Sequence, residues 1–146
     1  MPNLVLKDYE ANFELSYAAL LKEITLVEVF FPYLKFSSLP QFYTNLLVGL
    51  ASGNEVVLLD PDFSDSEIEK LLGSIDSLQQ EKAVEVKSDS MEQLLSNIEA
   101  NGGSLSLFTS GTTGLPKKVT HSVGNFIRGV RRSDSHSNNV WGLAYN

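Results

Sequence analysis

The sequence predicts an α/β fold in which helices cover both faces of a mostly parallel sheet. Short apolar runs alternate with amphipathic stretches along the chain, the order that produces parallel strands linked by right-handed helical crossovers. One of these runs is apolar almost throughout, as strands covered on both faces are. With 146 residues, of which 42% are apolar and 20% charged, the chain is long enough to bury one core.

The first part of the chain predicts a strand between two helical segments. Residues 17–22 are weakly helical, and residues 24–31 are rich in β-branched and aromatic side chains, which favours a strand that Pro32 ends. Residues 42–50 have apolar side chains at helical spacing, and Gly53 stands where such a helix would stop.

The next segment predicts the most deeply buried strand and a capped helix. Residues 55–60 form the nearly continuous apolar run, which Pro61 bounds. Ser64 and Glu67 have the spacing of a capping box, and the helix that they open is expected to stop at Gly73. Its inward face is expected to consist of Ile68, Leu71 and Leu72.

A further strand, helix and strand follow. Residues 83–86 predict a short strand, and Asp89 is placed to cap a helix that ends at the glycine pair 102–103. The side chains expected to face inward from this helix are Leu94, Leu95 and Ile98. Residues 104–108 predict the next strand.

A glycine-rich loop separates the predicted strand at 104–108 from the last two predicted elements. Residues 121–132 carry Phe126, Ile127 and Val130 at helical spacing, and residues 140–145 predict a final strand. The loop therefore follows the carboxyl end of the strand at 104–108, and ligands of parallel sheets bind at that edge.

Composition and charge narrow the classes of function. The chain has no cysteine and only two histidines, His121 and His136, so we expect no metal site built by the protein. No stretch approaches the roughly 20 apolar residues of a membrane span, and the amino terminus lacks a signal-peptide pattern, so we expect a cytoplasmic protein. The formal net charge of −7 argues against nucleic-acid binding.

The charge is nevertheless distributed in a way that suits a small polyanionic ligand near the loop. Residues 1–100 contain 6 Lys and Arg against 17 Asp and Glu, whereas residues 101–146 contain 5 against 1. A positive field beside a glycine-rich loop attracts phosphate, although an incidental arrangement of surface charge is the alternative.

The residue types of the loop indicate oxyanion binding. Gly111 and Gly114 allow backbone N–H groups to converge on a phosphate and let it approach the main chain. Lys117 supplies a compact positive charge, and the following helix is expected to contribute the partial positive charge of its amino terminus. The hydroxyl donors are Thr109, Ser110, Thr112 and Thr113.

Three alternatives to this interpretation can be compared. A Ser/Thr/Gly surface turn with incidental lysines remains a purely conformational explanation of the loop. A Walker phosphate loop requires four residues between its glycines and a lysine directly after the second, whereas only two residues separate Gly111 and Gly114. The dinucleotide pattern requires three glycines, so both of these nucleotide motifs are excluded.

Residues 107–117, Leu-Phe-Thr-Ser-Gly-Thr-Thr-Gly-Leu-Pro-Lys, resemble the signature of the adenylate-forming (AMP-binding) superfamily at every constrained position. This superfamily includes acyl- and aryl-CoA synthetases, luciferases and the adenylation domains of peptide synthetases. Weaker similarity covers residues 39–61, which resemble the family's helix, glycine and strand ending in Asp-Pro, and residues 64–72, which resemble its next helix. Residues 13–20 are similar to the family's opening helix.

The resemblance implies a site for the β- and γ-phosphates of ATP, formed by Thr109, Ser110, Gly111, Thr112, Thr113, Gly114 and Lys117. It also implies an AMP-forming carboxylate–CoA ligase. A carboxylic acid attacks the α-phosphorus of ATP to give an acyl-adenylate and pyrophosphate, and the thiol of CoA or of a carrier pantetheine then captures the acyl group. Mg²⁺ is expected with ATP, and the loop would stabilise the leaving pyrophosphate electrostatically.

The resemblance also implies that the catalytic residues lie elsewhere. About 100 residues precede the loop, fewer than the family usually has, and Lys118 stands where the family usually has a glycine. We therefore expect residues 1–146 to be an incomplete amino-terminal domain that lacks the adenine-binding motifs, the magnesium-binding acidic residue and the lid domain. We expect such a chain not to catalyse the reaction alone. We expect it to self-associate or to bind the missing part of the enzyme.

The alternative function is a stand-alone nucleotide- or phosphate-binding module, or a regulatory subunit, without ligase activity. Other residues of the chain are not assigned to the site. His121 is expected to be a solvated or cap-bonded residue, and the arginines at positions 128, 131 and 132 are expected to form a solvated helix face. The aromatic residues expected in the core are Phe30, Phe31, Tyr33, Trp141 and Tyr145.

Overall fold

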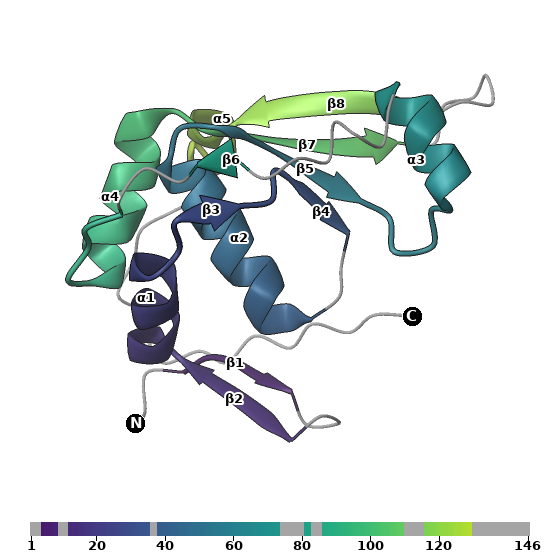
Figure 1. Cartoon of the computed structure of the whole chain (residues 1–146). Coiled ribbons are helices and arrows are strands. Elements are labelled where there is room, and N and C mark those ends of the chain that lie inside the picture. The colour runs from purple at the N-terminus through teal and green to yellow at the C-terminus, as the bar shows by residue number, and fades with distance from the viewer. Residues whose placement is uncertain are drawn as a thin grey trace.

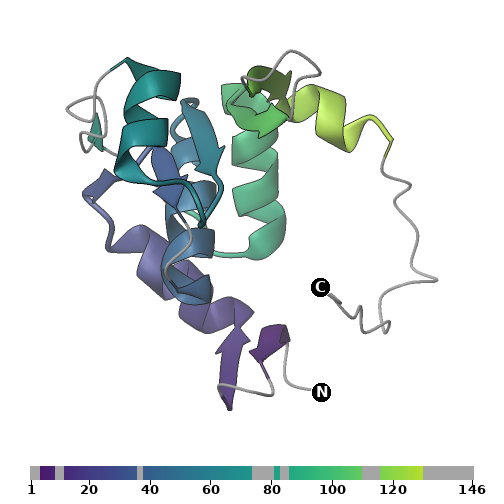
Figure 2. The ribbon, with the colours of Figure 1, turned by 90° about the vertical axis from the view of Figure 1, so that its right-hand side faces the viewer.

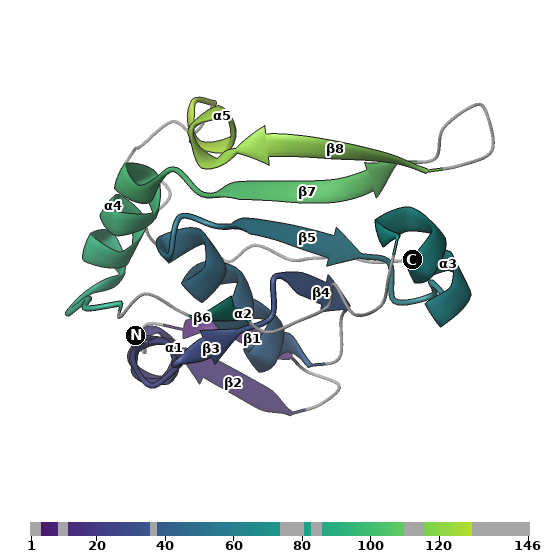
Figure 3. The same cartoon turned by 45° about the horizontal axis from the view of Figure 1, so that its top comes forward.

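The central element is a four-stranded sheet with the strand order β4-β5-β7-β8 (Figures 1 and 3). The structure is a computed structural model, and it describes residues 4–8, 12–35, 38–73, 81–82, 86–109 and 116–129. The strands of the sheet are β4 (Tyr33–Lys35), β5 (Glu55–Leu59), β7 (Ser104–Thr109) and β8 (Lys117–Ser122). β4, β5 and β7 are parallel, whereas β8 is antiparallel to β7. The predicted mostly parallel sheet is confirmed.

Helices cover β5 on both of its faces, as its apolar sequence predicts. On one face a Cβ added to Gly49 of α2 (Leu39–Ala51) would lie 2.5 Å from Val56 Cγ2. On the other face Val57 and Leu59 form a cluster with Ile68 of α3 (Asp65–Leu72). Because successive strand residues point to opposite sides, α2 and α3 lie on opposite faces of the sheet. Figure 2 shows α3 on one side of β5 and α4 (Met91–Asn101) on the other.

The main core lies on the α2 face, where α1 (Tyr17–Thr25) and α4 (Met91–Asn101) pack against α2. Its fully buried side chains come from segments far apart in the sequence. The largest of them are Phe30, Leu20, Ile24, Leu94 and Val48. Burial of this apolar surface is the main contribution to the stability of the fold.

The predicted capping box of α3 is confirmed. Ser64 Oγ accepts a hydrogen bond from Glu67 N at 3.4 Å, and Ser64 N donates to Glu67 Oε2 at 2.8 Å. A hydrogen bond from Ser64 Oγ to Glu67 Oε2 at 2.6 Å, together with the bond from Ser64 N, lowers the pKa of the Glu67 carboxyl group. The helix ends at Gly73, whose φ of 84° is favourable only for glycine.

The prediction of a strand over residues 24–31 is wrong for most of that range. α1 continues to Thr25, and Ile24 is buried on its inward face four residues after Leu20. Only β3 (Val29–Phe30) is a strand there, and it pairs antiparallel with β6 (Glu81–Lys82).

The sequence did not indicate the hairpin formed by β1 (Leu4–Asp8) and β2 (Phe13–Ser16), which lies at the lower edge of Figure 1. Lys7 Nζ lies 2.6 Å from Glu14 Oε1 across this pair. The segment 13–20, which resembles an opening helix of the adenylate-forming family, is therefore a strand up to Ser16 and helical from Tyr17 onward.

Two details of the α4 region also differ from the prediction. Ser90, not Asp89, caps α4, since Ser90 Oγ accepts a hydrogen bond from Gln93 N at 3.2 Å. Leu94 and Ile98 face the core as predicted, but Leu95 is 55% exposed. In the predicted strand at 83–86, Val86 is buried outside any strand, and residues 83–85 lie outside the described residues.

The largest difference concerns the segment after the glycine-rich loop, where a helix was predicted for residues 121–132. Residues up to Ser122 belong to β8, and α5 (Val123–Ile127) is a short helix. Residues 130–132 and the predicted strand 140–145 lie outside the described residues. Among the helices described, none has the length and apolar character needed to span a bilayer.

Candidate functional site

The two ends of the predicted phosphate loop lie opposite each other on neighbouring strands. Thr109 is the last residue of β7, Lys117 is the first of β8, and their Cα atoms are partners in the antiparallel register. Thr109 Oγ1 donates a hydrogen bond to Lys117 O at 3.4 Å. The remaining predicted site residues lie outside the described residues: Ser110, Gly111, Thr112, Thr113 and Gly114.

Both ends of the loop, Thr109 and Lys117, lie at the carboxyl edge of the parallel strands. Lys35 ends β4 at the same edge, and its Nζ donates a hydrogen bond to Phe63 O at 2.6 Å. Phe63 in turn packs edge to face against Phe108 of β7, with ring centroids 6.3 Å apart. The predicted position of the loop, after the carboxyl end of a parallel strand, is confirmed. Ligands of open α/β sheets bind at this edge.

The expected contribution of a helix amino terminus to the loop is wrong. Because β8 runs antiparallel to β7, α5 begins at the opposite end of β8, six residues after Lys117 (Figure 3). The cap of α5 is Ser122, whose Oγ accepts a hydrogen bond from Asn125 N at 3.3 Å. The partial positive charge of a helix amino terminus acts only over about one turn, so it does not reach the loop.

His121 and Arg128 also lie towards the distal end of this strand and helix. His121 is exposed on β8, and its ring packs edge to face against Phe126 with centroids 5.4 Å apart. The sequence places His121 at the first position of a helix, whereas it is the last residue but one of β8, and it is exposed as expected. Arg128 is exposed as expected, whereas Arg131 and Arg132 lie outside the described residues.

The two consecutive lysines of β8 have different surroundings. Lys118 Nζ lies 2.9 Å from Glu55 Oε1 and 3.0 Å from Glu55 Oε2. Lys117 is exposed and forms no ion pair or side-chain hydrogen bond with any described residue. Of the two ammonium groups, Lys117 is therefore the one available to an anion.

Glu55 is held by two hydroxyl groups as well as by Lys118. Ser106 Oγ and Thr120 Oγ1 both donate to Glu55 Oε1, the second at 3.3 Å. Partial burial of Glu55 raises the pKa of its carboxyl group. The hydrogen bonds from Ser106 and Lys118, the charge of Lys118 and the hydrogen bond from Thr120 together lower it by more than burial raises it, so the pKa of Glu55 lies below its ordinary value.

Little in the sequence indicates this cluster. Glu55 stands at the start of an otherwise apolar strand, and an acidic residue at such a position is a signal for a charged or hydrogen-bonding partner. Its partner Lys118, however, is 63 positions away, and only the sheet brings the two together.

No protein-family model, curated protein or solved structure matches this chain. Membership of the adenylate-forming superfamily therefore stays a prediction that rests on the motif at residues 107–117.

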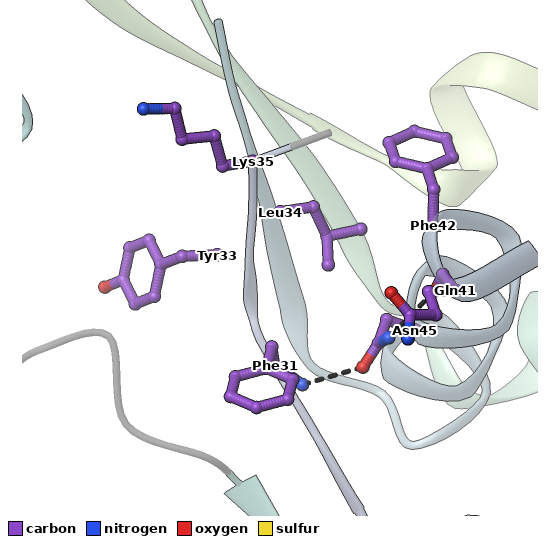
Figure 4. Close-up of a pocket in the computed structure, with 7 residues that line it drawn as sticks. All are labelled: Phe31, Tyr33, Leu34, Lys35, Gln41, Phe42 and Asn45. Atoms are coloured by element: carbon purple, nitrogen blue, oxygen red, sulfur yellow. Dashed lines mark hydrogen bonds between the residues drawn. The ribbon is translucent and has the colours of Figure 1, made fainter. Parts of the chain in front are cut away.

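A separate cavity of about 330 Å³ lies between β4 and α2 (Figure 4). Its lining residues are Phe31, Tyr33, Leu34, Lys35, Gln41, Phe42 and Asn45. Phe30 is fully buried as predicted, but Phe31 is 44% exposed at the rim of this cavity instead of in the core. The side-chain amide of Asn45 is hydrogen-bonded to the backbone: Oδ1 accepts from Phe31 N at 3.0 Å, and Nδ2 donates to Gln41 O at 2.8 Å.

Among the residues that the structure describes, no three histidine or acidic side chains are grouped to hold a metal ion. Glu55, the carboxylate beside β8, is already paired with Lys118. We therefore assign no protein ligand for the Mg²⁺ expected with ATP.

Proposed function

We propose that this chain is the ATP-binding, amino-terminal portion of an AMP-forming carboxylate–CoA ligase of the acyl-CoA synthetase type. The observation that carries the proposal is the position of the motif. The loop joins β7 to β8 at the carboxyl edge of the parallel strands, and the exposed ammonium group of Lys117 stands at its end. A glycine- and hydroxyl-rich turn at this edge provides donors for phosphate oxygens.

In the proposed reaction the loop binds the part of ATP that leaves. When a carboxylate attacks the α-phosphorus, negative charge accumulates on the β- and γ-phosphates, which depart as pyrophosphate. Lys117 and the donors of the loop would stabilise this charge, which is electrostatic catalysis without a covalent step. CoA or a carrier pantetheine would accept the acyl group. We assign no catalytic residue within these 146 residues, so we expect binding without turnover by this chain alone.

The proposal is tested by calorimetric titration of the chain with magnesium pyrophosphate and with magnesium ATP. Lys117→Ala is expected to weaken pyrophosphate binding at least about tenfold, because a hydrogen bond to a charged group contributes roughly 1.5–3 kcal/mol. Lys22→Ala on α1 removes another exposed lysine and is the matched control, with unchanged affinity expected. Equal affinity of the wild type and Lys117→Ala would remove Lys117 from its proposed role.

A stand-alone phosphate-binding module would give the same titration, so a second experiment separates the two functions. The gene downstream of the codon for Asn146 is sequenced. A reading frame that continues into a Tyr-Gly-x-Thr/Ser-Glu-like motif and a late lysine supports the ligase. A stop codon directly after Asn146 in the natural gene contradicts it and favours the module.

A further inference from the structure

The cluster around Glu55 links three strands of the main sheet at one point. Glu55 opens β5, Ser106 lies in the middle of β7, and Thr120 and Lys118 belong to β8. Ser106 Oγ also lies 2.6 Å from Thr120 Oγ1. Ser106 has no exposed surface, and its hydroxyl group contacts the side chains of Glu55 and Thr120. We call these four residues the Glu55 cluster.

The cluster draws the Lys118 ammonium away from the loop. The Cα of Lys118 is opposite Phe108, directly beside the pair Thr109 and Lys117 that begins the turn. Its Nζ, however, contacts the Glu55 carboxylate, which is bonded to the Ser106 hydroxyl further back along β7. The side chain of Lys118 therefore extends along the sheet in the direction opposite to the turn.

The same contacts fix the position of Lys117. Successive strand residues point to opposite faces, so anchoring Lys118 to the α3 face places Lys117 on the other face of β8. A slip of one residue would exchange the two lysines, and the bonds of Thr120 and Lys118 to Glu55 are formed only in the observed register.

We propose that the Glu55 cluster is a positioning device for the phosphate loop: it neutralises Lys118 and fixes the register of β8, so that Lys117 alone is presented to the anion. This inference rests on the proposed function. It also accounts for Lys118 at the position where the adenylate-forming family usually has a glycine, because Glu55 offsets the additional charge. A paired lysine adds little to the field felt by a ligand.

The first experiment needs no ligand. The folded chain is treated with a limiting amount of an amine-acylating reagent, and the modification of each lysine is followed by mass spectrometry. Lys118 is expected to react more slowly than Lys117 in the wild type, because its ammonium group is held by Glu55. In Glu55→Gln, which keeps the size of the side chain and an acceptor oxygen, the rate at Lys118 is expected to rise about two- to fivefold.

Lys22 is the control in that experiment, and its rate is expected to be the same in both proteins. Equal reactivity of Lys117 and Lys118 in the wild type, or an unchanged rate at Lys118 in a folded Glu55→Gln variant, would overturn the inference. Circular dichroism establishes that the variant is folded.

The second experiment measures pyrophosphate affinity at low ionic strength. Glu55→Gln releases Lys118, so the double variant Glu55→Gln/Lys117→Ala is expected to bind about two- to fivefold more tightly than Lys117→Ala alone. The triple variant that also carries Lys118→Ala is the control, and it is expected to lose this gain. A double variant that binds no better than Lys117→Ala contradicts the inference.

A further variant does not depend on the folding of Glu55→Gln. Lys118→Met leaves the Glu55 carboxylate without its ammonium partner and is expected to weaken pyrophosphate binding, but by less than about threefold, because Glu55 and Lys118 are each 39% exposed and solvent screens the unpaired charge. A loss as large as that of Lys117→Ala would mean that Lys118 itself contacts the anion.

The two proposals fail in different ways. If the wild type does not bind pyrophosphate, the proposed function fails, while the acylation rates still decide whether Glu55 holds Lys118. If the wild type binds but the acylation rates are equal, the positioning role fails and the proposed function stands.

Discussion

The inner strand β5 and the edge strand β8 belong to one sheet but are held by different forces. Val56, Val57 and Leu59 of β5 are nearly inaccessible, covered by α2 on one face and α3 on the other. In β8 every side chain is exposed except that of Val119, which is partly buried. The strand is held by its backbone hydrogen bonds to β7 and by the Glu55 cluster. The difference indicates that stability resides in the apolar side of the molecule, whereas the proposed site lies on a polar edge that contributes little to stability.

The largest expected effect tests the apolar side. Phe30→Ala is expected to lower the free energy of unfolding by about 3–5 kcal/mol, because it empties a fully buried position in the core. The neighbouring Phe31→Ala is the matched control, with a smaller expected change of about 1 kcal/mol because Phe31 is 44% exposed. Urea unfolding measures both. Similar losses from the two variants would contradict the assignment of the core to the Phe30 face.

The contact between α2 and β5 gives the next largest effect. A Cβ at position 49 would lie 2.5 Å from Val56 Cγ2 and 2.9 Å from Phe30 Cε2, so Gly49→Ala is expected to destabilise the fold. Overpacking costs about 1–3 kcal/mol, from which the higher helix propensity of alanine recovers roughly 1 kcal/mol.

Gly124→Ala in α5 is the control for this contact, because the nearest atom to its added Cβ is Ser122 Oγ at 3.9 Å. It is expected to be neutral or stabilising in thermal unfolding. If both glycine variants raise the melting temperature equally, α2 does not pack on β5 as closely as described.

A smaller effect is expected on the polar side. Ser106→Ala removes a buried hydroxyl that donates to Glu55, and the loss of one such hydrogen bond is expected to cost about 1 kcal/mol. The variant is expected to remain folded but to react faster with an acylating reagent at Lys118. A destabilisation as large as that of Phe30→Ala would show that β8 belongs to the same stabilising core as β5.

The smallest effect is a pH dependence. Because the pKa of Glu55 is lowered in the folded state, its contribution to stability is present above the ordinary value near 4.5 and is lost as the pH falls through the lowered pKa. The side chains of Glu55 and Lys118 are each 39% exposed, so this contribution is below about 1 kcal/mol. The difference in unfolding free energy between the wild type and Glu55→Gln is expected to be constant near neutral pH and to shrink below pH 4.5. A difference that grows with acidification would contradict the assignment.

The elements that the sequence predicted well are those whose signals are local. The apolar run of β5, the capping box at Ser64 and the terminal glycine of α3 each lie within a few residues of the element that they define. β7 and most of α4 are likewise marked by their own side chains and the glycines between them.

The elements that were missed depend on contacts between distant segments. Ile24 has a β-branched side chain that favours a strand, but its spacing from Leu20 places both on the buried face of α1, and packing outweighs propensity. β8 has only one apolar side chain, so nothing local marks it as a strand, and its hydrogen bonds come from pairing with β7. Leu95 fits the helical period but lies on the exposed side of α4.

The candidate site shows the same division. The loop was located from its own residues, and Thr109 and Lys117 do lie together at its ends. The prediction of a helix dipole at the loop was wrong, because it depended on the direction in which the chain continues after the loop, and β8 runs back along β7. The Glu55 cluster could not be predicted, because Glu55 and Lys118 are 63 positions apart in the sequence.

The most direct test of the account is to titrate the isotope-labelled chain with magnesium pyrophosphate and to follow each backbone amide by nuclear magnetic resonance. We predict that the shifted signals belong to residues 109–118 and their neighbours on β7, and that these shifts are lost in Lys117→Ala. Amides of α1 and of the cavity between β4 and α2 should not move. Shifts centred on the cavity residues Phe31 and Phe42, or no shifts at millimolar pyrophosphate, would contradict the assignment of the phosphate site to the turn between β7 and β8.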